Sequence, residues 1–102
     1  MLLFKKEFLP AIRRGEKTQT IRLWKHRRMK AGQRSYIPGA GTVRITAVDE
    51  VDLDRLTDAD ALPDGFETAD QLRAQLTRLY PDQLARCHRA YRVVFVLLSG
   101  QE

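Results

Sequence analysis

The spacing of apolar and polar positions changes several times along this 102-residue chain, and each change predicts a structural element. Residues 2–4 form a short apolar start, which indicates a strand. A short helix should follow, from residue 8 or 9 to residue 14, with Leu9 and Ile12 facing inward. Pro10 suits the first turn of that helix, and Gly15 can take the left-handed conformation that ends it.

In the middle of the chain, apolar and polar residues alternate as they do in the strands of a half-buried sheet. Residues 33–36 predict a strand that ends at the turn formed by Pro38 and Gly39. From residue 42 to residue 48, Val43, Ile45 and Ala47 alternate with Arg44, Thr46 and Val48. This alternation predicts a strand in a barrel wall, with the first set facing the core. The acidic stretch 52–60 has room for one helical turn.

The second half predicts a firm helix followed by a buried strand. Thr68 and Gln71 have capping-box spacing, and Leu72, Leu76 and Leu79 then recur at helical intervals. Proline at position 81 ends that helix, and the segment to residue 89 has room for another turn or short helix. Residues 91–98 are a continuous apolar run, which predicts a strand buried on both faces in the middle of the sheet.

Several short strands with helices inserted between them are typical of an α+β fold rather than of repeated βαβ units. The length suits a single domain over residues 1–102. One cysteine excludes an internal disulfide, and no apolar stretch is long enough to cross a bilayer. We therefore expect a protein of the reducing cytoplasm without a membrane segment.

Charge is distributed unevenly along the chain. Residues 1–34 hold eleven Lys or Arg against two Glu, a balance of +9, so the total of +5 leaves −4 for the remainder. Most of the acidic residues lie between positions 49 and 70. One surface should therefore attract phosphate backbones. The alternative is a solvated charge run that aids solubility.

One segment carries a pattern of chemistry rather than of folding, the octet Gly-Glu-Lys-Thr-Gln-Thr-Ile-Arg at residues 15–22. If it is extended, Thr20 and Arg22 share one face and Lys17 takes the other. Lys17 joins them only if a turn at Gly15 swings it round. A positive φ at this glycine would permit such a turn.

The octet resembles the signature of the ASCH domain family, Gly-x-Lys-x-x-(Glu or Thr)-x-Arg after a short N-terminal helix. The Pro-Asp-Gly-Phe stretch at residues 63–66, the helix ending at Tyr80-Pro81 and the apolar final strand are also similar to features of that family. The resemblance implies a PUA-like small β-barrel with two or three short helices, and an association with RNA. It covers nearly the whole chain.

Within that family, the octet is most similar to the branch that hydrolyses N4-acetylcytidine to cytidine and acetate. That branch has threonine at the position of Thr20, where many members have glutamate. The resemblance implies catalytic roles for Lys17, for Thr20 and for a carboxylate near residues 63–66. Asp64 stands there, one methylene shorter than the family's glutamate, while Glu67 lies farther along.

These residue types would suit nucleophilic catalysis. Lys17 would take the proton of Thr20, whose oxygen attacks the acetyl carbonyl to give an acyl-enzyme that water clears. Asp64 would orient the lysine or the exocyclic nitrogen, and Arg22 or a backbone amide would steady the oxyanion. The alternative is that Lys17 is a surface cation and that Thr20 was chosen for its β propensity.

The segment after the octet carries the chemistry of nucleic-acid contact. Trp24 could stack on a base, although a lone tryptophan could equally cap the core. Lys25, Arg27, Arg28 and Lys30 follow in a polar, aperiodic stretch that we expect to be a loop. Together these cations could bind phosphates without a fixed geometry.

The sequence indicates neither a metal site nor a cofactor. His26, Cys87 and His88 lack the spacing of a ligand set, and Cys87 is better explained as a small apolar filler. The expected site for RNA or substrate also includes Gly15 and Arg22, from the octet.

Two functions of different kinds are therefore predicted, and the first is binding of RNA or a modified nucleoside in a Lys/Thr/Arg-lined pocket at the barrel mouth. The alternative is a small amidohydrolase acting on N4-acetylcytidine. A ribonuclease is a weaker third, because the sequence presents no clear acid–base pair. The oligomeric state is not indicated.

Overall fold

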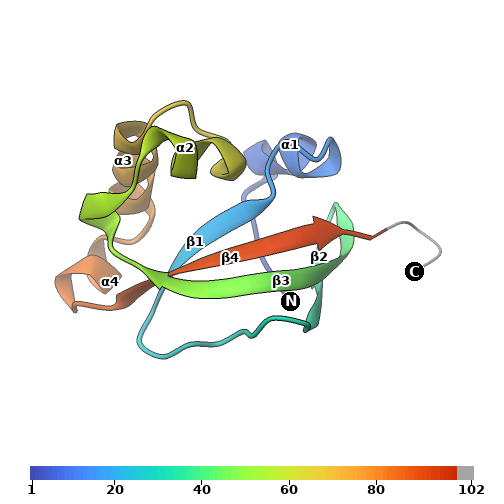
Figure 1. Ribbon diagram of the computed structural model, residues 1–102, viewed down its shortest axis with the longest axis horizontal. Coiled ribbons are helices and arrows are strands. Elements are labelled where there is room, and N and C mark those ends of the chain that lie inside the picture. The colour runs from blue at the N-terminus through green and yellow to red at the C-terminus, as the bar shows by residue number, and fades with distance from the viewer. Residues whose placement is uncertain (99–102) are drawn as a thin grey trace.

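The computed structural model describes residues 1–98, and its centre is a four-stranded antiparallel sheet in the order β1-β4-β3-β2 (Figure 1). The strands are β1 (Gln19–Trp24), β2 (Arg34–Ile37), β3 (Gly41–Val51) and β4 (Arg89–Leu97). The α-helices are α1 (Leu9–Arg13), α2 (Asp58–Ala61), α3 (Ala69–Leu79) and α4 (Pro81–Ala85). Short 3₁₀ helices are η1 (Lys6–Phe8), η2 (Leu53–Arg55) and η3 (Leu62–Asp64).

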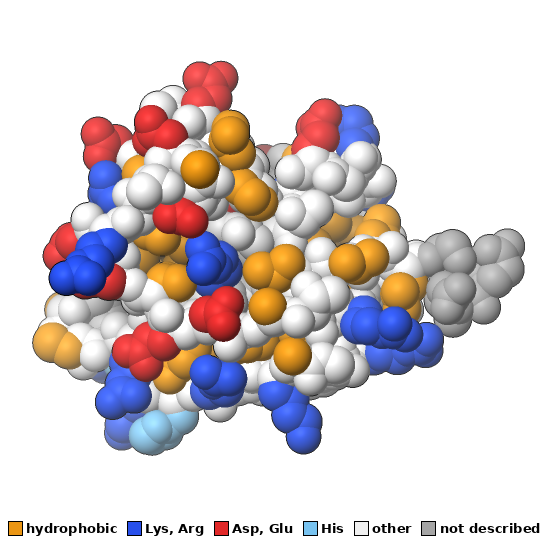
Figure 2. Space-filling view, in the orientation of Figure 1, with side chains coloured by type: hydrophobic (Ala, Val, Ile, Leu, Met, Phe, Trp, Pro, Cys, Tyr) orange, Lys and Arg blue, Asp and Glu red, His pale blue; other side chains and the backbone are white. Residues whose placement is uncertain are grey.

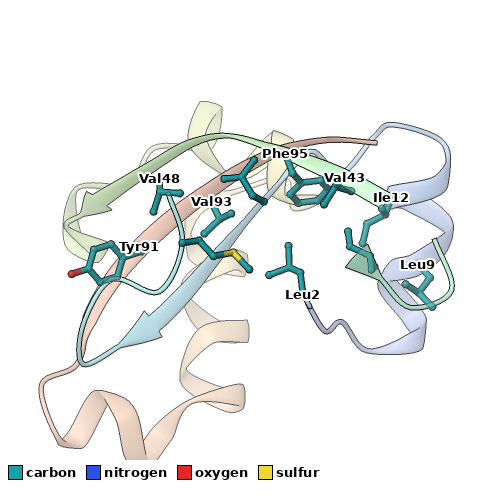
Figure 3. Close-up of a cluster of buried hydrophobic side chains, with 11 residues drawn as sticks. Leu2, Leu9, Ile12, Val43, Val48, Tyr91, Val93 and Phe95 are labelled. Atoms are coloured by element: carbon teal, nitrogen blue, oxygen red, sulfur yellow. The ribbon is translucent and has the colours of Figure 1, made fainter. Parts of the chain in front are cut away.

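The sheet curls into a half-barrel with a separate apolar cluster on each face. Along β4, Tyr91, Val93 and Phe95 point into the cluster inside the curl, which Leu2 and Ile12 help to fill (Figure 3). The cluster on the other face is completed mainly by α2 and α3; its buried members are Ile21, Leu23, Leu56, Ala61, Ala69, Leu72, Leu76 and Ala90. This arrangement confirms the predicted α+β, barrel-like fold, with four α-helices in residues 1–98 where two or three were expected.

The predicted first strand is wrong. Residues 2–4 form no strand, although the Leu2 amide donates a 2.9 Å hydrogen bond to the Tyr36 carbonyl. The exposed fraction of the Leu3 side chain is 61%, whereas that of Leu2 is 2%. The segment therefore anchors one side chain in the core and leaves the sheet edge after a single bond.

The predicted alternation of β3 holds only as far as a bulge. Val43 and Ile45 are fully buried, as expected, but the register shifts between Ile45 and Ala47. A bulge inserts one extra residue and so reverses the alternation beyond it. Val48 is consequently buried, and the prediction that it lies opposite the core-facing residues is wrong.

Strand β4 lies between β1 and β3, as the apolar run predicted. Its burial on both faces is not complete, because half of the Val96 side chain is exposed. The cluster built around α2 and α3 includes Ala90 at the other end of the strand, so the helices cover that end. Position within the sheet was therefore predicted correctly, and coverage of the second face was not.

Helix boundaries follow the predicted signals. Gly15 has φ of +78°, and α1 ends just before it. Thr68 accepts a 3.2 Å hydrogen bond from the Gln71 amide at the start of α3, but the Gln71 side chain accepts from Glu67 rather than closing the box on Thr68. A complete capping box occurs at α2 instead, formed by Thr57 and Asp60. Within residues 1–98, no helix has the length and apolarity to cross a membrane.

Candidate functional site

A pocket of about 260 Å³ opens between the N-terminal segment, β1, η3 and α3, and we call it the main pocket. Its wall contains Leu3, Phe4, Lys5, Phe8, Lys17, Thr20, Ile21, Arg22, Asp64, Phe66, Leu72, Gln75, Leu76, Leu79 and Tyr80. Most of this lining is apolar, with a few polar groups placed on it. That combination is typical of small-molecule sites, and the volume lies near the small end of the ~300–1,000 Å³ range usual for them.

The turn at Gly15 brings Lys17 to the same pocket as Thr20 and Arg22. The Lys17 amide still bonds back to the Ala11 carbonyl at 3.2 Å, so strand geometry begins only at Gln19. The Thr18 amide then donates to the Pro63 carbonyl at 2.7 Å, which holds the octet against η3. The alternation that would have separated Lys17 from Thr20 therefore does not apply.

Lys17 and Asp64 form a buried ion pair in the pocket wall. Lys17 Nζ lies 2.6 Å from Asp64 Oδ1 and also donates to the Asp64 carbonyl oxygen at 2.5 Å. Each side chain is only about 4% exposed. Burial lowers the pKa of Lys17, with the Asp64 charge opposing that shift, and burial raises the pKa of Asp64, with Lys17 opposing it. Both shifts bring the pair closer to exchanging a proton.

Three aromatic rings surround the ammonium group. Lys17 Nζ lies 5.2 Å from the ring centroid of Phe8, 5.7 Å from that of Phe4 and 5.9 Å from that of Phe66. Ring faces attract cations within about 6 Å, so the rings partly compensate for the water that Lys17 has lost. The three phenylalanines also exclude solvent from the ion pair.

Thr20 and Arg22 form a second polar pair on β1. Arg22 Nε donates to Thr20 Oγ1 at 3.0 Å, and an Arg22 terminal nitrogen donates to the Leu3 carbonyl at 2.6 Å. The guanidinium lies 4.7 Å from the ring centroid of Phe4, and burial lowers the pKa of Arg22. The hydrogen bond of Thr20 Oγ1 is thus with Arg22 and not with Lys17.

Behind the ion pair, Gln19 joins Asp64 to the rest of β1 and β4. Gln19 Nε2 donates to the Asp60 carbonyl at 2.9 Å and lies 3.4 Å from Asp64 Oδ2. The Asp60 carboxylate pairs with Arg92 at 3.1 Å. These contacts hold the Asp64 carboxylate toward Lys17.

A second cavity of about 290 Å³, which we call the basic groove, adjoins the main pocket and shares Arg22 and Tyr80 with it. Its other lining residues are Leu23, Trp24, Lys25, Arg28, Gln83 and His88. In Figure 2 many of the acidic side chains lie in the upper left, around α2 and α3, and others lie lower down, whereas several Lys and Arg lie along the lower edge of the molecule. The groove therefore combines positive charge with the Trp24 and Tyr80 rings.

Three predicted site residues line neither of these two cavities: Gly15, Arg27 and Lys30. Arg27 stacks over the Tyr91 ring at 5.8 Å, and the Lys30 amide donates to Gln33 Oε1 at 3.2 Å. Gly15 lies at the turn before Lys17 and lines a separate cavity near β4. Trp24 packs against Tyr91 with ring centroids 5.6 Å apart, so it is at once a core-capping residue and a wall of the groove.

No grouping of three or more His, Cys, Asp or Glu able to hold a metal ion occurs in residues 1–98. Cys87 is exposed and adopts φ of +58°, which does not match the expected apolar filler. Its neighbour His88 lines the basic groove, and His88 Nδ1 has no hydrogen-bond partner in the described chain.

The sequence reasoning missed several lining residues, notably Gln75, Tyr80 and Phe8. Gln75 had a detectable signal, because it is a polar residue directly before Leu76 on the apolar side of the predicted helix. In the sequence, Tyr80 marks only the end of that helix. Phe8 stands at the predicted start of the first helix, and a lone phenylalanine indicates burial but not which residues surround it.

Comparison with known proteins finds solved structures with a similar fold. No family model matches the chain, and no curated protein matches it in sequence. An ASCH domain from Lactobacillus crispatus JV V101 is similar in structure, with a TM-score of 0.71 and 13% identity over 85% of this chain and 67% of that one. Protein EF3133 from Enterococcus faecalis V583, of family DUF984, gives 0.74 and 18% identity over 90% and 67%.

A shorter structure is also similar along nearly its whole length. Protein PF0455 from Pyrococcus furiosus gives a TM-score of 0.69 at 18% identity, covering 95% of this chain and 94% of that one. At such identities the likeness concerns the fold alone. The chain therefore has a fold similar to that of the ASCH domain structure.

Proposed function

We propose that this protein binds a nucleotide unit of RNA, with the base in the main pocket and the phosphates along the basic groove. The observation that carries the proposal is the adjacency of the two cavities, which share Arg22 and Tyr80. One cavity is apolar with a few polar groups, and the other is cationic. A nucleotide has the same two parts, side by side.

The main pocket supports this proposal through its chemistry. Its aromatic and aliphatic walls suit a flat heterocycle, while Lys17, Thr20 and Arg22 present donors for ring and carbonyl acceptors. The volume of about 260 Å³ suits one base rather than a longer segment of RNA. A single unstacked base, as in a loop or a single strand, is the form that can enter.

The lining of the basic groove supports the proposal that it binds the phosphates. Lys25 and Arg28 line it beside the Trp24 ring, and cations with an aromatic face are the usual elements of single-strand binding. Arg27 and Lys30 belong to the same loop but line neither cavity. Phosphate binding should therefore depend more on Lys25 and Arg28 than on those two.

Binding of a fluorescent single-stranded RNA of mixed sequence, followed by anisotropy, tests the proposal. The variant Lys25→Ala/Arg28→Ala should weaken binding by about tenfold or more at low salt, because each phosphate that is no longer neutralised keeps its counterions. The matched control Arg44→Ala/Arg55→Ala makes the same change of charge at exposed positions outside both cavities. Equal effects of the two variants would reduce the binding to net charge and contradict the proposal.

A second candidate, hydrolysis of an N4-acylated cytidine, is favoured by a specific observation. Lys17, Thr20 and Asp64 all line the main pocket, and Arg22 donates to the Thr20 hydroxyl oxygen. The lowered pKa of Lys17 favours the neutral amine that a base requires. Arg22 would stabilise negative charge as it develops on oxygen.

Hydrolysis would proceed through an acyl-enzyme on Thr20. Thr20 Oγ1 bonds to the acyl carbon while the hydroxyl proton passes to Lys17 Nζ, and the C–N4 bond then breaks as that proton moves to the leaving nitrogen. Cytidine leaves, and water hydrolyses the Thr20 ester to release acetate and restore the hydroxyl. Asp64 positions the lysine throughout. A ribonuclease function has no such support, because the described residues place no second carboxylate or histidine in the pocket wall to pair with Lys17 and Asp64 as acid and base.

Release of acetate from N4-acetylcytidine by the purified protein tests this candidate. Thr20→Val keeps the shape of the side chain and removes the nucleophile, so turnover should fall below detection while the fold persists. Thr18→Val is the matched control, because Thr18 does not line the main pocket. Turnover that survives in Thr20→Val would exclude threonine as the nucleophile.

A further inference from the structure

Gln75 on α3 is a buried polar side chain in the wall of the main pocket, and its hydrogen-bonding capacity is only half used. It is 7% exposed. Its carbonyl oxygen accepts from a terminal nitrogen of Arg78, while Nε2 has no partner in the described chain. The neighbours Leu72 and Leu76 on the same helix face are apolar. An amide at this position is therefore not explained by packing.

Arg78 fixes which way the amide points. An arginine side chain carries donors only, so it must face the oxygen of the amide and not the nitrogen. The choice between the two orientations of Gln75, which depends on its hydrogen-bond network, is thereby determined. The NH₂ group is consequently the half of the Gln75 amide that is left without a partner in the wall of the main pocket.

Two other polar groups of the pocket also have hydrogen-bond donors to offer. Asp64 takes two of the three protons on Lys17 Nζ, which leaves one for a ligand. Thr20 accepts from Arg22, so its own hydroxyl proton is available to a ligand as well. The octet, through Lys17 and Thr20, and α3, through Gln75, thus each place a donor in the wall of the main pocket.

We propose that Gln75 is a ligand-binding residue that donates to a carbonyl oxygen or unprotonated ring nitrogen of the bound base, with Arg78 fixing its orientation. The ligand class is an acceptor-rich heterocycle, such as a cytosine base with its O2 and N3 acceptors. This inference rests on the proposed base-binding function of the main pocket. It adds α3 to a site that the octet alone would confine to β1 and η3.

The test measures equilibrium binding of cytidine by calorimetry, together with thermal unfolding without ligand. Gln75→Met keeps the length of the side chain and removes the amide. Binding should weaken about tenfold, as expected for a lost hydrogen bond in a pocket, while the melting temperature stays equal or rises because an unpaired buried group is gone. A purely structural amide would instead lower the melting temperature and leave the affinity unchanged.

Two further variants complete the test. Gln75→Glu replaces the donor by an acceptor held by the same Arg78, and it should weaken cytidine binding at least as much as Gln75→Met. Gln71→Met is the matched control on the same helix, where the side-chain amide accepts from the Glu67 backbone and does not line the pocket. It should leave the affinity unchanged.

The outcomes separate this inference from the function on which it rests. Wild-type affinity for cytidine with tenfold loss in both Gln75 variants supports both. Wild-type affinity that both Gln75 variants retain overturns the role of Gln75 and leaves the proposed function standing. A wild-type protein that binds no cytidine at millimolar concentration overturns the base-binding function and this inference together.

Discussion

The ammonium nitrogen of Lys17 lies 2.6 Å from a carboxylate oxygen of Asp64, with both side chains about 4% exposed, although the two residues are 47 positions apart in the chain. A buried ion pair is a weak source of stability, because each charge has lost its water. The pair here lies in a pocket wall, where Phe4, Phe8 and Phe66 surround the cation. Such a position is better suited to binding or catalysis than to holding the fold together.

Removing one member of the pair should destabilise the fold more than removing both. Lys17→Ala leaves the Asp64 charge buried without its ion-pair partner, which costs about 3–5 kcal/mol in comparable cases. The double variant Lys17→Met/Asp64→Leu replaces the pair by apolar groups and should unfold at a urea concentration equal to that of the wild type or higher. Urea denaturation followed by circular dichroism measures both. A double variant less stable than Lys17→Ala would contradict this description of the pair.

The pair should also give a characteristic dependence of stability on pH. The pKa of Asp64 is raised above its usual 3.8, so the folded chain binds more protons than the unfolded chain there, and the free energy of unfolding falls as pH rises through that window. The pKa of Lys17 is lowered below 10.5, so the free energy of unfolding rises again between the lowered value and 10.5.

The measurement is the difference in free energy of unfolding between the wild type and Lys17→Met/Asp64→Leu, from acid to alkaline pH. Relative to the double variant, the wild type should have its lowest free energy of unfolding in the intermediate pH window, where both groups are charged. A difference that stays constant across the whole range would mean that burial does not shift the two pKa values in these directions.

The turn before β3 should not accept a side chain at Gly39. This residue has φ of +89°, and an added Cβ would lie 2.8 Å from Cδ1 of Leu9. Gly39→Ala should therefore destabilise the fold by clearly more than the ~1 kcal/mol of left-handed backbone strain alone. Gly32→Ala is the control, because Gly32 has a similar φ of +90° and open space around it. Equal melting temperatures for the two variants would contradict the close approach of Leu9.

The capping box of α2 should contribute measurably to stability. Thr57 Oγ1 accepts from the Asp60 amide, and Asp60 Oδ2 accepts from the Thr57 amide at 2.9 Å. Thr57→Ala should cost about 0.5–2 kcal/mol, the range for lost N-caps. Thr57→Ser retains the acceptor and should cost only a small part of that amount in thermal unfolding. A serine variant as unstable as the alanine variant would assign the effect to the methyl group.

Salt should weaken RNA binding in proportion to the number of phosphates that the basic groove neutralises. On a single strand, the slope of log K against log salt changes by about 0.7 for each phosphate that the protein ceases to neutralise. Lys25→Ala and Arg28→Ala should each reduce the slope by about that amount, whereas Arg27→Ala should change it less because Arg27 lies over Tyr91. Anisotropy titrations between low and moderate salt give the slopes. An Arg27 effect as large as that of Arg28 would contradict the assignment to the groove.

Much of the fold could be predicted because local signals and the final structure agree. Proline and glycine positions marked both ends of α1, and the period of Leu72 and Leu76 marked α3. The bulge between Ile45 and Ala47 could not be predicted, because it depends on pairing with β4 and leaves no mark on the alternation itself. For the same reason, residues 2–4 resembled a strand although only Leu2 bonds to the sheet edge.

Part of the candidate site could likewise be predicted from the sequence, and part could not. Lys17, Thr20 and Arg22 are close in sequence, and the glycine before them indicated the turn that brings Lys17 round. The resemblance to a family indicated Asp64, which the residues alone could not connect to Lys17. Gln75 and Tyr80 come from a helix whose sequence pattern reports packing, so their place in the pocket became apparent only from the fold.

The most direct test of the central claim is the ¹H–¹⁵N spectrum of the labelled protein titrated with cytidine. The largest shifts should belong to the amides around Lys17, Thr20 and Gly65 and to the Gln75 side-chain NH₂, because these groups line or border the main pocket. The matched probe ribose 5-phosphate should instead shift the amides around Lys25 and Arg28 in the basic groove. Cytidine shifts that are absent, or that centre away from the main pocket, would contradict the claim that this pocket binds a base.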